Sequence, residues 1–423
     1  MDSTYITNIK VNHVRHLKDI EIPLSESERK HLIITGKNGS GKTSLLEAMR
    51  LAIWLYSEVP PMRSRIIEKL NKENDPLKSQ FQINKILPNA GDIIYYQEKN
   101  FLNFFKEKVG VEIEMKSFNF KEFQLNLKNF IIAYYPAERE YSVSNERGLE
   151  KVNLKEISQI YEYPSKYFVK YLKELKAQEA LYQVNGNIER ANEIKSWLEN
   201  LTRTLRNVFS NEKLTLELNP ETFEFKINEP GKIPFAFDEL ASGYSASLAV
   251  ILDLMMRMEK KVGRKYDIPG IVLIDEVDAH LHLSLQKNIL PTLTTLFPNI
   301  QFIVTTHSPF VLNSISNAVV YNLETKTLVN TEEGLSRLPY SGIVEGYFGV
   351  SELSAKLKEK FERYKELSKK AHFTDDDYNE LGDLESYLDE IPDFLALDIM
   401  ADYRQIKLEL EQREEAEGNN GQM

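Results

Sequence analysis

Residues 36–43, GKNGSGKT, have the composition and spacing of a phosphate-binding loop, with four residues between the first glycine and the final Gly-Lys-Thr. Glycines allow backbone N–H groups to approach phosphate oxygens closely, and a helix that follows directs the positive end of its dipole toward them. In such a loop Lys42 neutralises phosphate charge and the Thr43 hydroxyl binds Mg²⁺. Contacts to ATP are therefore expected from nine consecutive residues: Gly36, Lys37, Asn38, Gly39, Ser40, Gly41, Lys42, Thr43 and Ser44.

A loop of this kind needs an acidic partner, and residues 270–278, GIVLIDEVD, provide one after an apolar run. Asp275 would end a buried strand and hold Mg²⁺ through water, while Glu276 would polarise the attacking water as general base. On its own, an apolar strand followed by two acids is more often a surface cap. The phosphate loop makes the catalytic interpretation the stronger one, so we expect both acids to lie beside the bound nucleotide.

A histidine follows another β-branched run, IVTTHSPF, at residues 303–310. A lone histidine is usually a satisfied surface or core residue. His307, however, comes 31 residues after Glu276, with a helix between the two strands. Its strand should therefore end beside the strand that carries Glu276, and we expect His307 to sense the γ-phosphate.

Residues 240–245, LASGYS, precede an apolar helical pattern. Serine and glycine are common in turns, but a pair that opens a helix forms an anion site, because its N–H groups and hydroxyl are directed outward. The phosphates of the chain's own ATP are already held by the glycine loop. We therefore expect Ser242 and Gly243 to contact the ATP of a second copy.

Strands and helices must place these motifs side by side. Residues 1–35 show three strand patterns that lead into the glycine turn, and apolar residues repeat at helical spacing from 45 to 53. Residues 237–323 have the βαβ rhythm of buried parallel strands, which predicts an α/β fold. Four segments are expected: an N-terminal lobe at 1–150 with a polar insertion at about 56–110, a helical hairpin at 151–210, a second lobe at 211–343, and a helical extension with a disordered tail at 344–423.

Composition excludes several classes of protein. The 423 residues are 42% hydrophobic, enough for a sizeable core, and the net charge of −11 argues against indiscriminate coating of DNA. A local basic groove stays compatible with that charge. The chain has no cysteine, which excludes disulfides and cysteine-bound metal, and it has no apolar run of about 18 residues that could cross a membrane. We expect a soluble, cytoplasmic protein.

In order along the chain, GKNGSGKTSLLEA, LASGYSA, LIDEVDAHLH and TTHSP resemble the Walker A, signature, Walker B and switch-histidine motifs of ABC-type ATPases, within the compact SMC, RecF and Rad50-like branch. The resemblance implies an ATPase head with a P-loop core and mixed sheet, an N-terminal antiparallel β region and a helical insertion, here with a C-terminal helical extension. It also implies two heads that close around ATP, with Lys42, Glu276 and His307 catalytic. The signature departs from the transporter form LSGGQ, because Tyr244 replaces the glutamine, and no Q-loop glutamine can be assigned.

Four weaker features leave alternatives open. Asp278 falls where these ATPases carry a loop that contacts the partner head, but it could equally be solvent exposed. His280 and His282 have the spacing of a metal pair, although similar ATPases carry such histidines without metal. Arg15 could approach the nucleotide or be a solvated strand residue, and residues 134–140, YYPAERE, resemble an element of this branch whose role the sequence does not reveal.

The C-terminal region has apolar residues at helical spacing between 353 and 399. This arrangement resembles the standalone ATPases of Septu-type antiphage systems, which are paired with a separate HNH nuclease. The resemblance favours a defence ATPase that forms a homodimer and regulates such a nuclease; a RecF-like or Rad50-like repair ATPase that binds DNA is the alternative. We expect the helices at about 350–410 either to dock a partner or to pack against the protein's own core.

Overall fold

The computed structural model describes residues 4–57, 109–116, 129–139, 151–154, 160, 162–262, 266–332, 335, 342–344, 355–370, 372–391 and 397–420. The chain divides into two compact units, Met1–Leu338 and Pro339–Met423. Most of the predicted insertion, residues 58–108, lies outside the described residues. In the described part of the chain, no helix is long and apolar enough to cross a bilayer.

A six-stranded sheet forms the centre of the first unit, in the order β11-β10-β3-β9-β8-β5. The edge strand β11 runs antiparallel to β10, and all other neighbours are parallel. The inner strands are runs of aliphatic and β-branched residues buried on both faces, as parallel strands usually are. The parallel strands therefore end at one common edge. The bounds are β3 (His31–Thr35), β5 (Ile131–Tyr135), β8 (Gly270–Ile274), β9 (Ile300–Thr305), β10 (Ala318–Asn322) and β11 (Thr327–Asn330).

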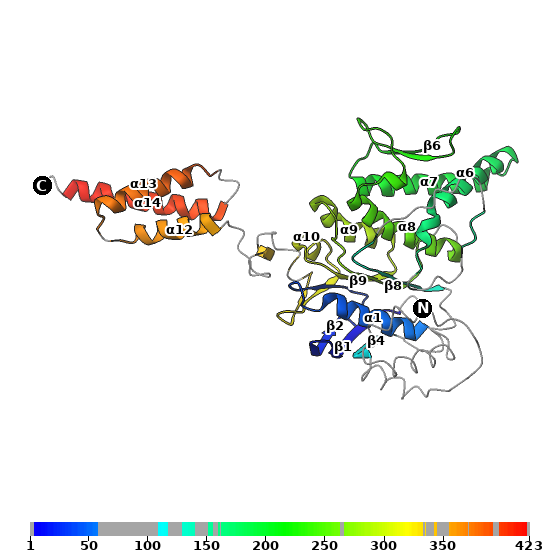
Figure 1. Cartoon of the computed structure of the whole chain (residues 1–423), viewed down its shortest axis with the longest axis horizontal. Coiled ribbons are helices and arrows are strands. Elements are labelled where there is room, and N and C mark those ends of the chain that lie inside the picture. Colours follow the sequence, from blue (N-terminus) through cyan, green and yellow to red (C-terminus); the bar gives the residue numbers. More distant parts are fainter. Residues whose placement is uncertain are drawn as a thin grey trace. The chain divides into compact units, whose positions relative to one another are not determined.

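Helix α1 (Lys42–Ser57) covers one face of this sheet together with a three-stranded antiparallel sheet, β2-β1-β4 (Figure 1). The antiparallel strands are β1 (Ile6–Val14), β2 (Leu17–Pro23) and β4 (Val111–Met115). The apolar residues that predicted α1 are completely buried in one core cluster: Leu45, Leu46, Met49 and Ile53. Burying each such side chain stabilises the fold by about 1.5–3 kcal/mol. The predicted order of strand, glycine loop and helix is confirmed.

Helices α8 (Ser242–Val262) and α9 (Leu283–Leu296) lie on the opposite face of the sheet (Figure 1). A helical hairpin, α6 (Phe168–Val184) and α7 (Ile188–Phe209), packs against them. The Asn187 side chain caps α7 by accepting a hydrogen bond from the Arg190 N–H at 3.3 Å, and Gly186, with φ of 76°, allows the sharp turn at VNGN. The remaining short elements are η3 (Pro164–Tyr167), β6 (Thr215–Leu218), β7 (Phe225–Asn228), η4 (Phe237–Glu239) and α10 (Pro309–Leu312).

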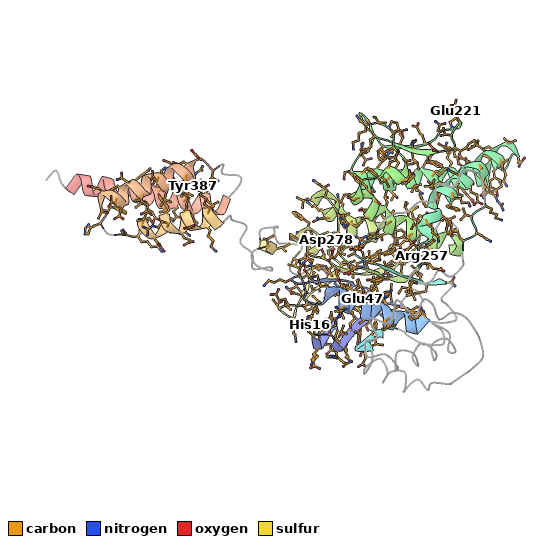
Figure 2. The ribbon with its side chains drawn as sticks, viewed as in Figure 1. His16, Glu47, Glu221, Arg257, Asp278 and Tyr387 are labelled. Atoms are coloured by element: carbon orange, nitrogen blue, oxygen red, sulfur yellow. The ribbon has the colours of Figure 1, made fainter. Side chains whose placement is uncertain are left out.

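A buried ion pair joins α8 to strand β5. Asp253 and Arg257, one turn apart on α8, are 2.7 Å apart, and their side chains are 0% and 2% exposed. Asp253 also accepts hydrogen bonds from the Tyr135 hydroxyl at 2.8 Å and the Ser165 N–H at 3.1 Å. Arg257, labelled in Figure 2, donates to the Ile132 carbonyl at 3.3 Å. Because each buried charge has several partners, the pair fixes α8 to the sheet without an unpaired charge.

Removal of one partner should therefore destabilise the first unit strongly. In Asp253→Ala the Arg257 guanidinium stays buried without its carboxylate, which costs about 3–5 kcal/mol in comparable pairs. We expect a clearly lower midpoint of urea unfolding, followed by circular dichroism. The control is Glu380→Ala, which removes the exposed partner of Arg363 in the second unit and should change little. Equal effects of the two substitutions would contradict a structural role for the buried pair.

The second unit contains three helices in its described residues: α12 (Ala355–Ser368), α13 (Asp375–Asp389) and α14 (Leu397–Asn420). Their apolar side chains form a core of their own: Phe361, Tyr364, Leu367, Leu381, Leu384, Leu388, Met400, Tyr403 and Leu410. Phe361 and Tyr364 are only 3% and 0% exposed. These apolar residues therefore cover one another within the second unit.

A chain that ends at Leu338 should keep a folded first unit. The truncation removes a complete core cluster and takes no residue from the cluster around α1. We expect a soluble product whose thermal unfolding midpoint for the first unit equals that in the full chain, measured by circular dichroism and differential scanning calorimetry. An insoluble product, or a first unit that melts at a much lower temperature, would show instead that the second unit completes the first.

Candidate active site

The glycine loop lies at the carboxyl end of β3 and leads into α1. Gly36, Gly39 and Gly41 have φ angles of 139°, 80° and 98°, which glycine adopts without the strain that other residues would suffer. A Cβ added to Gly36 would lie 2.8 Å from the Ser40 Oγ, so a side chain there would force the Ser40 hydroxyl to move as well as strain the backbone. The backbone is thus curled as the GKNGSGKT pattern predicts.

The polar groups of this loop are arranged for an anion. The Lys42 Nζ donates to the carbonyls of Gly36 at 2.9 Å and Lys37 at 3.0 Å, and Lys42 is only 6% exposed. Burial lowers the pKa of Lys42, while nearby carboxylates oppose that shift. The Ser40 Oγ is buried with no hydrogen-bond partner, and Thr43 is exposed at the start of α1. A phosphate group fits this loop, because it would accept hydrogen bonds from Lys42 and Ser40.

Asp275 and Glu276 follow β8 at the same edge. Asp275 is 2% exposed and accepts a hydrogen bond from the Thr305 Oγ1 at 2.5 Å. The same hydroxyl oxygen accepts from the Glu276 N–H at 2.7 Å. Glu276 has a left-handed backbone with φ of 44°, which costs about 1–3 kcal/mol for a residue other than glycine. Such strain, held in place by neighbours, is typical of functional sites, and here it falls on the predicted general base.

His307 follows β9, the strand between β3 and β8. The structure therefore brings His307 to the edge that its spacing predicted. Burial lowers the pKa of His307, Lys42 lowers it further, and Asp278, Glu276 and Asp275 oppose both effects. The imidazole is consequently neutral at pH 7 and lies within the electrostatic reach of all the other charged groups named for this edge.

Asp278, labelled in Figure 2, is half-buried and bonded to the loop that carries His307. Its Oδ1 accepts from the Thr306 Oγ1 at 2.5 Å, and Thr306 Oγ1 accepts from the Ser308 N–H at 2.9 Å. The Ser308 hydroxyl donates to Gln286 Oε1 at 2.7 Å, and Gln286 Nε2 donates to the Leu281 carbonyl at 2.8 Å. The loops after β8 and β9 are thus joined, and Asp278 takes part in this connection while staying partly exposed.

Arg139 also lies at this edge, and sequence reasoning did not identify it. It follows β5, the neighbour of β8, and its guanidinium donates to the carbonyls of Asp275, Glu276 and Val277 at 2.8, 3.1 and 3.2 Å. The one available signal was the YYPAERE segment, to which no role could be assigned. The structure supplies the missing information, which is that β5 pairs with β8.

Ser242 and Gly243 begin α8, as their sequence context predicted. Ser242 is exposed, whereas a Cβ added to Gly243 would lie 2.8 Å from the His280 carbonyl oxygen. Tyr244, which replaces the transporter glutamine, stacks on Phe209 of α7 with ring centroids 4.1 Å apart. The signature segment therefore packs against the loop after β8 and against the helical hairpin, while its serine stays open.

The weaker candidates are also placed. Arg15 is exposed in the β1–β2 turn with φ of 52°, and the adjacent His16 Nε2 lies 3.1 Å from the Ser40 carbonyl oxygen. This turn therefore contacts the glycine loop, although no described contact involves the Arg15 guanidinium itself. His280 and His282 are exposed, and the residues described here contain no group of three or more potential ligands that could hold a metal ion.

A family model described as "AAA domain, putative AbiEii toxin, Type IV TA system" matches residues 32–313, which contain the glycine loop, the signature, Asp275, Glu276 and His307. The chain belongs to this family. It has an AAA domain with an α/β fold, in which the N-terminal strands are antiparallel and the described residues of the second unit are helical. The predicted α/β class is confirmed, and membership of this AAA family supports the predicted ATPase activity.

Two curated relatives share part of their length with this ATPase. The Septu protein PtuA of Bacillus mycoides is 27% identical over 371 residues, which are 85% of this chain and 47% of that protein. The Retron Ec83 probable ATPase of Escherichia coli is 35% identical over 149 residues, 34% of this chain and 28% of that protein. The chain therefore spans about half the length of the first relative and about a quarter of the second.

Among solved structures, the Smc head domain with an extended coiled coil, bound to the C-terminal domain of ScpA and derived from Pyrococcus furiosus, is 15% identical to this chain. The match covers 79% of this chain and 98% of that one, with a TM-score of 0.38.

Proposed function

We propose that two copies of this ATPase close around ATP, and that ATP binding and hydrolysis control an effector nuclease in antiphage defence. One observation supports the proposed dimer. Lys42 and Glu276 lie at the sheet edge, whereas Ser242 is exposed at the start of a long helix and packs against no phosphate loop in its described contacts. A helix start with an exposed hydroxyl favours an anion, and the ATP held by a second copy would supply one.

In the proposed cycle the phosphates of ATP bind the N–H groups of residues 36–43 and the Lys42 ammonium. Thr43 and Asp275 would hold Mg²⁺, because a hydroxyl and a carboxylate are oxygen ligands of the kind this ion prefers. When bound, the ion would neutralise phosphate charge. Thr305 keeps the Asp275 carboxylate in one orientation through its 2.5 Å hydrogen bond.

Glu276 then accepts a proton from the water that attacks the γ-phosphate, while His307 donates an N–H to a γ-phosphate oxygen. Burial lowers the pKa of His307, so its ring is neutral at pH 7 before ATP arrives. A neutral donor contacts the phosphate without repelling the Lys42 ammonium. Asp278, held by Thr306 beside His307, is proposed to contact the second head.

The role in defence is supported by the names of two relatives, a Septu protein and a retron ATPase. The proposed partner is a separately encoded nuclease, of the HNH type in the Septu case. Neighbouring genes provide a direct test, because an adjacent HNH nuclease gene would support this assignment. Adjacent recombination genes would favour the alternative, a RecF-like or Rad50-like repair ATPase that binds DNA.

Glu276→Gln should bind ATP normally and hydrolyse it about 10²–10⁴-fold more slowly, because it lacks the general base. Its ATP-bound dimer should persist in analytical ultracentrifugation. Lys42→Ala should lose ATP binding, measured by calorimetry. The matched control is Glu21→Gln on β2, whose side chain is 59% exposed and should not affect turnover. Wild-type hydrolysis by Glu276→Gln would rule out the assignment of the base.

Ser242 should act on the ATP of the other copy. A mixture of Lys42→Ala and Ser242→Arg chains, each inactive alone, forms heterodimers in which one composite site is intact, so random pairing restores about a quarter of wild-type activity. A mixture of Lys42→Ala and Glu276→Gln provides the control, because both substitutions damage the same half of the site and nothing should be recovered. If heterodimers form in the first mixture without any activity, the shared site is disproved.

A further inference from the structure

We propose that Arg139 is a positioning residue that fixes Glu276 through main-chain hydrogen bonds, without touching the nucleotide. The inference deepens the proposed function and rests on the role of Glu276 as general base. Its starting point is a contact of unusual form, in which one guanidinium reaches the carbonyls of three consecutive residues, Asp275, Glu276 and Val277.

The conformation of Glu276 makes this contact informative. Successive carbonyl groups of an extended strand point to opposite sides, so they cannot converge on one donor. At Glu276 the left-handed backbone, with φ of 44°, interrupts the extended chain, and the three carbonyls meet the two terminal nitrogens of Arg139. Hydrogen bonds from a charged donor are stronger than neutral ones, and three of them outweigh the strain of one left-handed residue. Arg139 is therefore able to select this conformation.

The bonds go to the main chain, which leaves the Glu276 carboxylate available. An arginine paired directly with that carboxylate would stabilise its charged form and weaken it as a base. Burial lowers the pKa of Arg139 to about 10, while Asp278, Asp275 and Glu276 oppose the shift, so the guanidinium is charged at pH 7. Within the described residues no carboxylate lies at ion-pair distance from it, and its Nε is buried without a hydrogen-bond partner.

Arg139 is itself held by its own turn and strand. Its guanidinium donates to the Pro136 carbonyl at 3.1 Å, which closes the turn after β5. Tyr135, the last residue of β5, accepts a hydrogen bond at its carbonyl from the Asp275 N–H at 2.8 Å. Its hydroxyl donates to Asp253 on α8. The hydrogen bonds from Arg139 to the main chain around Glu276 therefore start from a fixed part of the sheet, as a positioning group requires.

The experiment compares Arg139→Ala, Arg139→Lys and Glu276→Gln, alone and combined. Arg139→Ala should lower kcat about 10²-fold, the effect of misplacing a catalytic group by about an ångström, with ATP affinity unchanged. Arg139→Lys keeps the charge but lacks the planar fork that reaches several acceptors at once, so it should recover little of the rate. In the Glu276→Gln background, Arg139→Ala should cause no further loss, because it acts through the group already removed.

Arg29→Ala is the matched control. Arg29 also uses its guanidinium to bind two main-chain carbonyls, those of Asn299 and Pro298, but it lies before β3, at the opposite edge of the sheet. Its removal should lower stability without a selective loss of kcat. If Arg139→Ala fails to fold, Arg139→Lys supports the same comparison, because it keeps the positive charge and most of the side chain.

Each outcome has one meaning. Wild-type turnover by Glu276→Gln would overturn the proposed function. Loss of turnover in Glu276→Gln together with wild-type turnover in Arg139→Ala would overturn only the inference about Arg139. A fall in ATP affinity with kcat unchanged, or an equal further loss in the Glu276→Gln background, would overturn it as well, because Arg139 would then act on the nucleotide directly or independently of the base.

Discussion

A parallel sheet delivers the carboxyl ends of its strands to one edge, and this alignment brings Lys42, Glu276 and His307 together from distant parts of the sequence. Register makes the alignment exact to a residue, since Ile274 pairs with both Val304 and Tyr135. A slip by one residue would turn every side chain of a strand to the opposite face, and the differently shaped side chains of these buried strands would then no longer fit their packed neighbours. The geometry of the site is therefore as well defined as the packing of the sheet.

Three charged groups at this edge, Lys42, Asp275 and Asp278, have no direct ion pair in the described contacts, whereas Lys37 of the glycine loop pairs with Glu324 after β10 at 2.7 Å. Lys42 donates to loop carbonyls, Asp275 accepts from the Thr305 hydroxyl, and Asp278 accepts from Thr306. Buried charges are costly unless they have partners, and here the partners are fixed dipoles and hydroxyls instead of opposite charges. The ammonium and the carboxylates thus stay available for phosphate and for the attacking water. If Lys42 were paired with an acid, that ion pair would have to break before the ammonium could bind phosphate.

The sequence was sufficient to place groups whose position depends on the local backbone. The positions of Lys42 and Asp275 could be predicted because a glycine turn and an apolar strand can each be recognised from about ten residues of sequence. Arg139 could not, because its acceptors are known only when β5 is seen to pair with β8. The ion pair of Asp253 and Arg257 was hidden for a related reason, since a helix pattern shows which side is buried but not which strand it meets. In the second unit, likewise, helical spacing predicted a buried face but not that the three helices bury it among themselves.

Helix α8 connects these long-range contacts to the surface offered to a second copy. Its first residues include Gly243, against the His280 carbonyl, and its middle includes Asp253, bonded to the strand that precedes Arg139. The loop that contains His280 is in turn joined through Gln286 and Ser308 to the residue next to His307. In the proposed dimer, His307 would contact one ATP and Ser242 would contact the other. The segments that carry these two residues are therefore connected by a series of short contacts. Contiguous contacts do not by themselves transmit a signal, so coupling between the two sites of the proposed dimer would require this network to have two alternative arrangements.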